Sequence, residues 1–195
     1  MTKAEKTRQF IIEKSAPIFN TKGVAGTAMS DIMEATKLAK GSLYVHFENK
    51  EDLAYSAVDY NLSLLVDRIS ASLNGLKTSK AKLLAVLDAL SNPLKPAVIG
   101  GCPMLNFGTE ADDTNPVILQ KVNKVMNAIQ QTSIDLIEEG KANGEFKNTW
   151  NSSDYAVKSF AMVEGGILIS RISGNKERMK VIIRLLKAEI EDQST

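Results

Sequence analysis

Apolar residues recur every three or four positions along most of the chain. The spacing is clearest near the end, where one helical face would carry Met179, Ile182, Ile183, Leu186 and Ile190. This period matches the 3.6 residues of a helical turn, whereas a half-buried strand would need strict alternation, which we do not find. The sequence therefore predicts an all-α fold.

Helix start and stop signals divide the chain into segments. Thr2 and Glu5 form a capping-box pattern that opens a first helix, Pro17 is expected to bend it, and Gly23 is expected to end it. Further helices are expected to begin near residues 27, 40, 49, 79, 104, 116, 152 and 175, with a loop over 140–150. The result is a chain of helices without internal repeats.

Composition limits the class of protein. The chain has 195 residues, of which 44% are hydrophobic and 24% charged, as in ordinary globular proteins. No apolar run approaches the roughly 20 residues that cross a bilayer. The charged N-terminus does not resemble a signal peptide, and the single cysteine, Cys102, excludes an internal disulfide. We therefore expect a cytoplasmic protein without membrane contact.

The segment from Thr27 to Phe47 has the pattern of a helix-turn-helix, in which two short helices flank a tight turn near residues 36–39. In the second short helix, Leu43 and Phe47 are four residues apart and would hold it on the core. The positions left exposed carry small or polar side chains that suit the major groove, namely Lys40, Gly41, Ser42, Tyr44 and His46. Residues 1–47 also carry seven lysines and arginines against four acidic residues, an excess of three that suits contact with phosphate.

The run from Ile32 to Phe47, continued by Lys50-Glu51-Asp52-Leu53, closely resembles the signature of the TetR family of transcriptional regulators. The resemblance implies a three-helix DNA-binding head over residues 1–48. It also implies a larger helical domain for ligand binding and dimerisation over 49–195, entered by a connecting helix over 49–73. The implied protein is a repressor that binds palindromic operator DNA as a homodimer and is released by a small-molecule inducer or an electrophile.

The same resemblance assigns the DNA contacts. Lys40 and Ser42 are the candidates for base edges, with Ser30 and Val45 as further ones. The residues expected to contact phosphates are Thr27, Tyr44, His46 and Lys50, and Gly41 lies between the two base-reading candidates.

Two positions depart from the family pattern. Lys37 stands where the turn usually has glycine, so it is expected to adopt a positive φ. Ala39 stands where serine or threonine usually caps the recognition helix, and an alanine cap costs about 1 kcal/mol.

The larger domain is expected to hold the ligand and the dimer contact. Adaptable methionines and stacking aromatics point to a pocket among Met104, Phe107, Met126, Ile129, Trp150, Phe160, Met162 and Glu164. Gly165-Gly166 and the broad apolar faces of the last two helices favour a four-helix interface between two copies. The alternative is that both apolar stripes are buried within one subunit.

Cys102 has two interpretations. A helix that begins next to it would lower the pKa of its thiol, and Gly-Cys before an apolar helix is similar to the branch of the family that includes the N-ethylmaleimide-responsive repressor. Cys102 would then be an electrophile sensor and part of the ligand site. The other interpretation is a small buried residue.

An enzyme is not expected. The chain has one histidine, so it lacks a multi-histidine metal site, and none of the common catalytic or nucleotide-binding motifs is present. We expect neither a metal nor a cofactor. The alternative to a regulator is a helical carrier of small molecules without a DNA function, which salt-dependent binding to palindromic DNA would distinguish.

Overall fold

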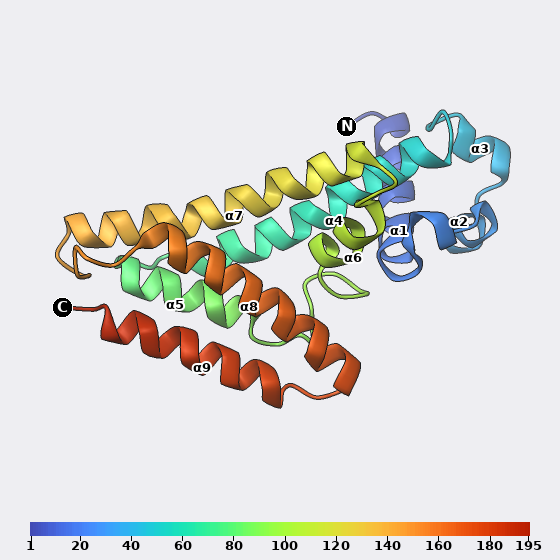
Figure 1. The fold of residues 1–195 in the computed structure, drawn as a ribbon. Coiled ribbons are helices and arrows are strands. Elements are labelled where there is room, and N and C mark those ends of the chain that lie inside the picture. Colours follow the sequence, from blue (N-terminus) through green and yellow to red (C-terminus); the bar gives the residue numbers. More distant parts are fainter. The chain divides into compact units, whose positions relative to one another are not determined.

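A computed structural model describes residues 1–195 as nine helices, joined by turns and loops (Figure 1). Their bounds are α1 (Lys3–Gly26), α2 (Met29–Thr36), α3 (Lys40–Tyr44), α4 (Lys50–Leu73), α5 (Ser79–Leu90), α6 (Pro103–Ala111), α7 (Pro116–Ala142), α8 (Ser152–Ser173) and α9 (Glu177–Asp192). The only β-type pairing is an isolated bridge between Phe146 and Ser194. The all-α fold is confirmed, and no helix is both long enough and apolar enough to span a membrane.

The helix ends follow the local signals with small shifts. The capping box at Thr2 and Glu5 is present, and Thr78 caps α5. The loop after α7 begins at residue 143 rather than at 140. The N-cap of α8 is Asn151, one residue before the start expected near residue 152. Its side chain accepts from the Asp154 N–H.

The chain divides into two compact units. The first comprises residues 1–65 and 97–124, and the second comprises residues 66–96 and 125–195. Each unit therefore takes part of α4 and part of α7, and α6 belongs to the same unit as the helices at the start of the chain.

The core of the first unit joins α1 to the short helices. Ile11 and Phe19 of α1, Ile32 of α2, Leu43 of α3 and Leu53 of α4 are at most 1% exposed. Pro17 leaves the backbone of α1 helical on both sides, and the one departure from helical geometry is at Gly23, where φ is +77°. Contacts of α1 with α2 and with α6 complete the unit.

The second unit packs α9 against α5 and α8. Gly166 of α8 permits the close approach of α9, because a β-carbon there would lie 2.9 Å from Ile182 Cδ1 and from Met179 Sδ. The rings of Phe146, Trp150 and Tyr155 form an edge-to-face cluster with centroid separations of 5.0 and 4.9 Å. Burial raises the pKa of the Tyr155 phenol well above its ordinary value.

Gly140 in α7 supplies a test of this packing. A β-carbon at Gly140 would lie 2.2 Å from Cδ2 of the buried Phe146 ring, so Gly140→Ala should lower the free energy of unfolding by about 1–3 kcal/mol. The control is Gly108→Ala in α6, where the added carbon would be 3.5 Å from Val122 Cγ1, an ordinary contact. Urea unfolding should show a neutral or stabilised control, and equal effects of both changes would contradict the packing described.

Candidate nucleic-acid interface

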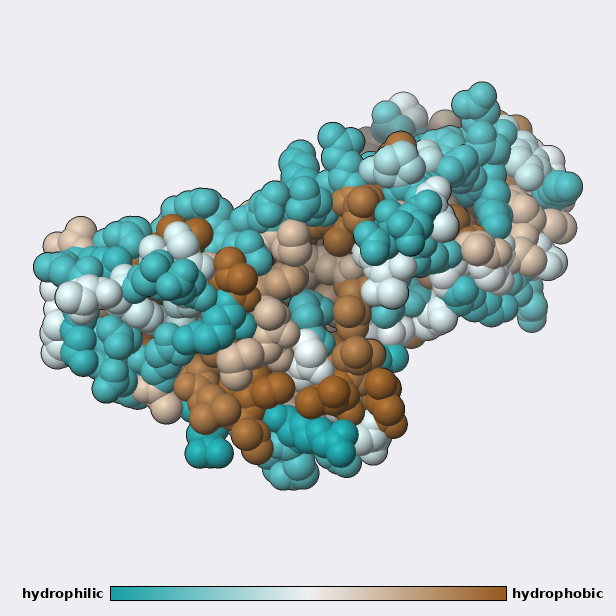
Figure 2. Space-filling view, viewed as in Figure 1, coloured by the Kyte–Doolittle hydropathy of each residue, from teal (hydrophilic) through white to brown (hydrophobic).

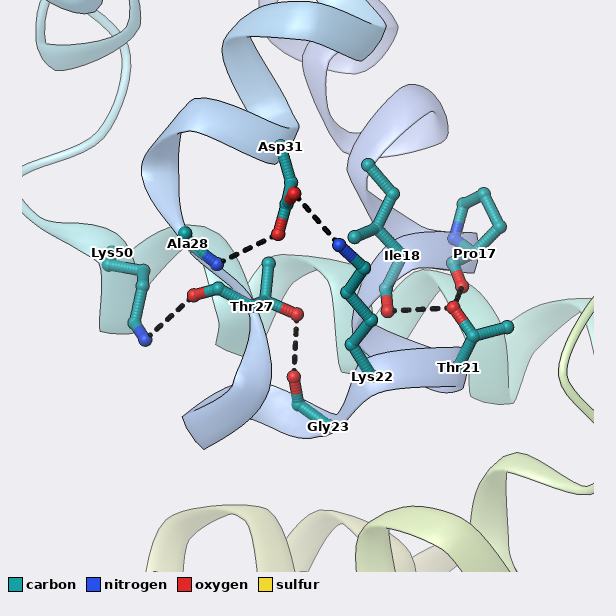
Figure 3. A network of polar contacts seen from close by, with 9 residues as sticks. All are labelled: Pro17, Ile18, Thr21, Lys22, Gly23, Thr27, Ala28, Asp31 and Lys50. Atoms are coloured by element: carbon teal, nitrogen blue, oxygen red, sulfur yellow. Dashed lines mark hydrogen bonds and ion pairs between the residues drawn. The ribbon is translucent and has the colours of Figure 1, made fainter.

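The connection between α1 and α2 is a compact polar turn. Thr27 is 1% exposed, and its hydroxyl donates to the Gly23 carbonyl at 2.6 Å. Ala28 is the N-cap of α2 and has no hydroxyl to offer, but Asp31 accepts from the Ala28 N–H at 3.0 Å. Figure 3 shows Thr27 between Gly23 and Lys50 and shows Asp31 reaching both Ala28 and Lys22.

Asp31 is held in its ionised form at this turn. The Lys22 ammonium lies 2.8 Å from the carboxylate, and this hydrogen bond, followed by that from the Ala28 N–H, lowers the pKa of Asp31. A carboxylate in the first turn also complements the helix dipole of α2, which supports the start of that helix.

Lys50 closes the turn from the other side. Its ammonium, from the first residue of α4, donates to the carbonyls of Val24 at 2.9 Å and Thr27 at 3.0 Å. An ammonium has three N–H donors, so one of the three remains for a further acceptor. Asn49 caps α4 by accepting from the Asp52 N–H at 2.9 Å.

The turn between α2 and α3 has the unusual backbone expected from the sequence. Lys37 adopts φ +59° and ψ +25° and is the one non-glycine residue with a positive φ. Its N–H donates to the Met33 carbonyl at 2.8 Å, and Thr36 accepts from the Leu38 N–H at 3.3 Å. The expectation of a left-handed Lys37 is confirmed.

The core side of α3 is fixed by Leu43 and Phe47, which are 0% and 3% exposed. The Arg8 guanidinium of α1 lies 4.7 Å from the centroid of the Phe47 ring and also donates to the Ser56 hydroxyl at 2.9 Å. Ala39 occupies the N-cap position of α3 and, as expected, its side chain makes no capping hydrogen bond. α3 is therefore anchored by tertiary packing instead of by its own cap.

The solvent side of the two short helices carries most of the expected DNA contacts. Val45 is 79% exposed and Tyr44 41% exposed, and His46 and Lys50 are partly exposed. The others that are exposed are Ser30, Lys40, Gly41 and Ser42. The Lys40 ammonium lies 5.9 Å from the centroid of the Tyr44 ring, so the first turn of α3 presents a cation beside an aromatic face. The exception is Thr27, whose buried hydroxyl serves the turn.

The candidate ligand residues are divided between the two units. Cys102, Met104 and Phe107 belong to the first unit, and the second unit contains Met126, Ile129, Trp150, Phe160, Met162 and Glu164. Trp150 is 5% exposed and packs in the aromatic cluster with Phe146 and Tyr155. A cleft of about 460 Å³ in the first unit includes Phe107 but none of the other eight.

Cys102 lies at the start of a helix, as the sequence predicts. It is the N-cap of α6, followed by Pro103 in the first turn, and it is 6% exposed. Its burial supports the interpretation as a small buried residue, since a sensor thiol must be reached by its electrophile.

Two polar residues that were not expected from the sequence, Asn20 and Glu110, join α1 to α6 and to the loop before it. Asn20, 3% exposed, donates to the carbonyls of Ile99 at 2.8 Å and Gly101 at 3.2 Å. Glu110 accepts from the N–H groups of Val24 and Ala25. The one signal in the sequence was Asn20, which lies next to Phe19 of the apolar face. A buried side-chain amide needs hydrogen-bond partners, so its presence there indicates a polar contact with another segment.

Two family models together match most of the chain. Residues 11–57 match the model described as bacterial regulatory proteins, tetR family. Residues 79–186 match the model described as tetracyclin repressor-like, C-terminal domain.

Individual relatives agree with these matches. The chain is 26% identical over 175 residues to the HTH-type transcriptional repressor DhaR of Mycobacterium sp. (strain GP1), covering 87% of this chain and 85% of the relative. A TetR transcriptional regulator from Chloroflexus aurantiacus is 35% identical, with a TM-score of 0.95 over 100% of this chain and 98% of that chain. The reduced form of Escherichia coli NemR is 18% identical, with a TM-score of 0.82 over 97% of each chain, which shows the shared fold alone.

Lys37 provides a test of the turn. Lys37→Gly removes the cost of a side chain in the left-handed region, about 1 kcal/mol or more, and adds the smaller entropic cost of glycine. We expect the free energy of unfolding to rise by about 0.5–1 kcal/mol in urea unfolding. Lys37→Ala keeps the strain and removes the same charge, so it should give no such gain; equal stabilisation by both changes would contradict the account.

Proposed function

The chain belongs to the TetR family of bacterial regulatory proteins, and from this membership we propose that it is a dimeric repressor that binds palindromic operator DNA and releases it when a small molecule binds. Members of this family are transcriptional regulators rather than enzymes, and DhaR, a relative over most of its length, is named a repressor. The proposed site of action is the cytoplasm, with residues 1–48 as the DNA-binding head and residues 49–195 as the regulatory and dimerisation domain, connected through residues 49–73.

The observation that carries the DNA-binding function is the two-sided character of α3. Its apolar side chain Leu43 and the ring of Phe47, three residues after its end, are buried, whereas Lys40, Gly41 and Ser42 in its first turn are exposed. A helix held in this way can present its N-terminal residues to base edges in a major groove. In this proposal Lys40 and Ser42 contact bases, with Ser30 and Val45 as neighbours.

The phosphate contacts follow from the surrounding groups. Tyr44 at the end of α3 is exposed, and His46 in the turn after it is partly exposed. Lys50 has one ammonium N–H that is not used by Val24 or Thr27. Thr27 contributes by shaping the turn, since its hydroxyl is buried and bonded to Gly23. Such contacts fix the register of the head on the duplex but carry no sequence information themselves.

Exposed apolar stripes on α8 and α9 support dimerisation. On α8, Val157, Leu168 and Ile172 are 58%, 45% and 77% exposed and share one face with the open Gly165. On α9, Val181 and Leu185 are 46% and 49% exposed. Figure 2 shows hydrophobic residues, in brown, gathered over the end of α8 and over α9. An exposed apolar face of this kind suits a second copy of the chain.

The proposed release follows from linkage between two sites. A ligand bound in the larger domain would tilt α4 and change the separation of the two recognition helices from the roughly 34 Å that matches one turn of DNA. Operator affinity then falls because the DNA-competent state is depopulated. Release by an electrophile would need attack on Cys102, which its 6% exposure disfavours.

Selection of binding sites from a random duplex pool tests the proposed function. The selected sequence should be palindromic, and its affinity should fall steeply with salt. Lys40→Gln should weaken binding to the selected site by about 1–3 kcal/mol and relax preference at the contacted base. Lys77→Gln, which removes an exposed cation in the loop before α5, is the matched control and should bind as the wild type does. A wild-type protein that selects no DNA would support the small-molecule carrier instead.

The dimer face has its own test. In sedimentation equilibrium the wild type should have twice the 21.2 kDa mass of one chain. Ile172→Glu should shift the mass toward one chain, because a carboxylate would be buried without a partner in the interface. Ile99→Glu, at a side chain 70% exposed in the first unit, should remain dimeric. A dimer that is unaffected by the change at Ile172 would place the interface elsewhere.

A further inference from the structure

The break in α1 leaves backbone groups that need partners. Gly23 departs from the helix with φ +77°, and the last turn of α1, from Val24 to Gly26, follows this break. The Glu110 carboxylate of α6 accepts from the Val24 N–H at 2.9 Å and from the Ala25 N–H at 2.8 Å. A carboxylate that accepts two N–H groups at the start of a helical turn is a strong, charge-assisted cap.

Glycine at position 23 makes this contact possible. A β-carbon there would lie 2.8 Å from Oε2 of Glu110, closer than such atoms approach, and the positive φ would also be strained. Gly23 therefore has two roles. It adopts the positive φ that breaks the helix, and it leaves space for the Glu110 carboxylate, which lies more than 80 residues further along the sequence.

The same short segment is held on its other side by a cation. The carbonyls of Val24 and Thr27 accept from the Lys50 ammonium, while the N–H groups of Val24 and Ala25 donate to Glu110. Thr27 directly precedes Ala28, the N-cap of α2. The segment Val24–Thr27 is thus bonded to both α4 and α6, and its position determines where α2 begins. Figure 3 shows the Lys50 side of this segment, with Thr27 next to Ala28.

α6 is docked on α1 at a second point before the break. Asn106 donates to the Asn20 carbonyl at 2.9 Å, and it lies four residues before Glu110, so both side chains leave the same face of α6. Gly100, in the loop before α6, has no space for a β-carbon, which would lie 2.9 Å from the Asn20 carbonyl oxygen. One face of α6 therefore binds α1 on both sides of Gly23.

The Glu110 contact can be released without disturbing the core. Glu110 is partly exposed and lies in the wall of the cleft of about 460 Å³, together with Val24, Ala25 and Lys50. Asn20 and Asn106, by contrast, are bonded in a more enclosed network. Because Glu110 is partly exposed, water can replace its two bonds when α6 shifts.

We propose that Glu110 is the positioning residue through which α6 sets the placement of the DNA-reading helices. With its carboxylate on Val24 and Ala25, the start of α2 is fixed and the head is ready to bind DNA. When α6 moves and the carboxylate leaves, the segment Val24–Thr27 keeps only the Lys50 contact and α2 loses its fixed start. The consequence for DNA affinity rests on the proposed function, whereas the contact itself does not.

Amide hydrogen exchange of the full-length protein, read residue by residue by NMR, tests the contact directly. Glu110→Gln keeps the size of the side chain but removes its charge, so exchange at Val24 and Ala25 should accelerate by about tenfold. Exchange in the core of α1 and the thermal midpoint should remain close to wild type. The matched control is Asp113→Asn, which removes one negative charge three residues after Glu110. The Asp113 carboxylate is exposed and makes no hydrogen bond or ion pair.

The same variants are then titrated with the duplex selected by the wild type. Glu110→Gln should weaken specific binding by about tenfold or more, while Asp113→Asn should not. Unchanged exchange at Val24 and Ala25 would overturn the contact, and faster exchange with unchanged affinity would overturn the positioning role. A uniform loss of protection throughout the head would show a merely structural residue. If the wild type selects no DNA, the proposed function and the positioning role fail together, and the exchange data still decide the contact.

Discussion

The break in α1 at Gly23 is the constraint on which the arrangement of the short helices depends. A helix that is interrupted near the core exposes N–H and C=O groups, and such groups must be paired. Here the partners come from two other helices, with a carboxylate of α6 on the N–H side and an ammonium of α4 on the C=O side. The placement of α2 is therefore decided by residues far from it in the sequence.

The sequence predicted well those features that depend on neighbouring residues. The capping box at Thr2 is formed between residues three apart, and the left-handed Lys37 follows from a turn that normally needs glycine. The burial of Leu43 and Phe47 agrees with their spacing of four residues, although α3 ends at Tyr44 and Phe47 lies after it. In each case the physical cause lies within one helical turn, so a single sequence contains it.

Features that depend on tertiary partners were not predictable in the same way. Thr27 stays a prediction for phosphate contact, and its hydroxyl donates to the Gly23 carbonyl, a partner that the sequence alone does not indicate. The contact of Glu110 was not predictable, because its partners Val24 and Ala25 donate backbone N–H groups that leave no side-chain signal in the sequence. Val157 has the spacing of a core residue, yet it lies on the exposed face of α8, since periodicity identifies a face but not what covers it.

The buried Leu43, the exposed polar first turn of α3 and the exposed apolar faces of α8 and α9 support the proposal that the protein reads DNA as a symmetric pair. Hydroxyl-radical footprinting on the selected duplex tests this most directly. The account predicts two equally protected half-sites whose centres are about one helical turn, roughly 34 Å, apart. A single unsymmetrical footprint, or uniform protection without preferred sites, would contradict it.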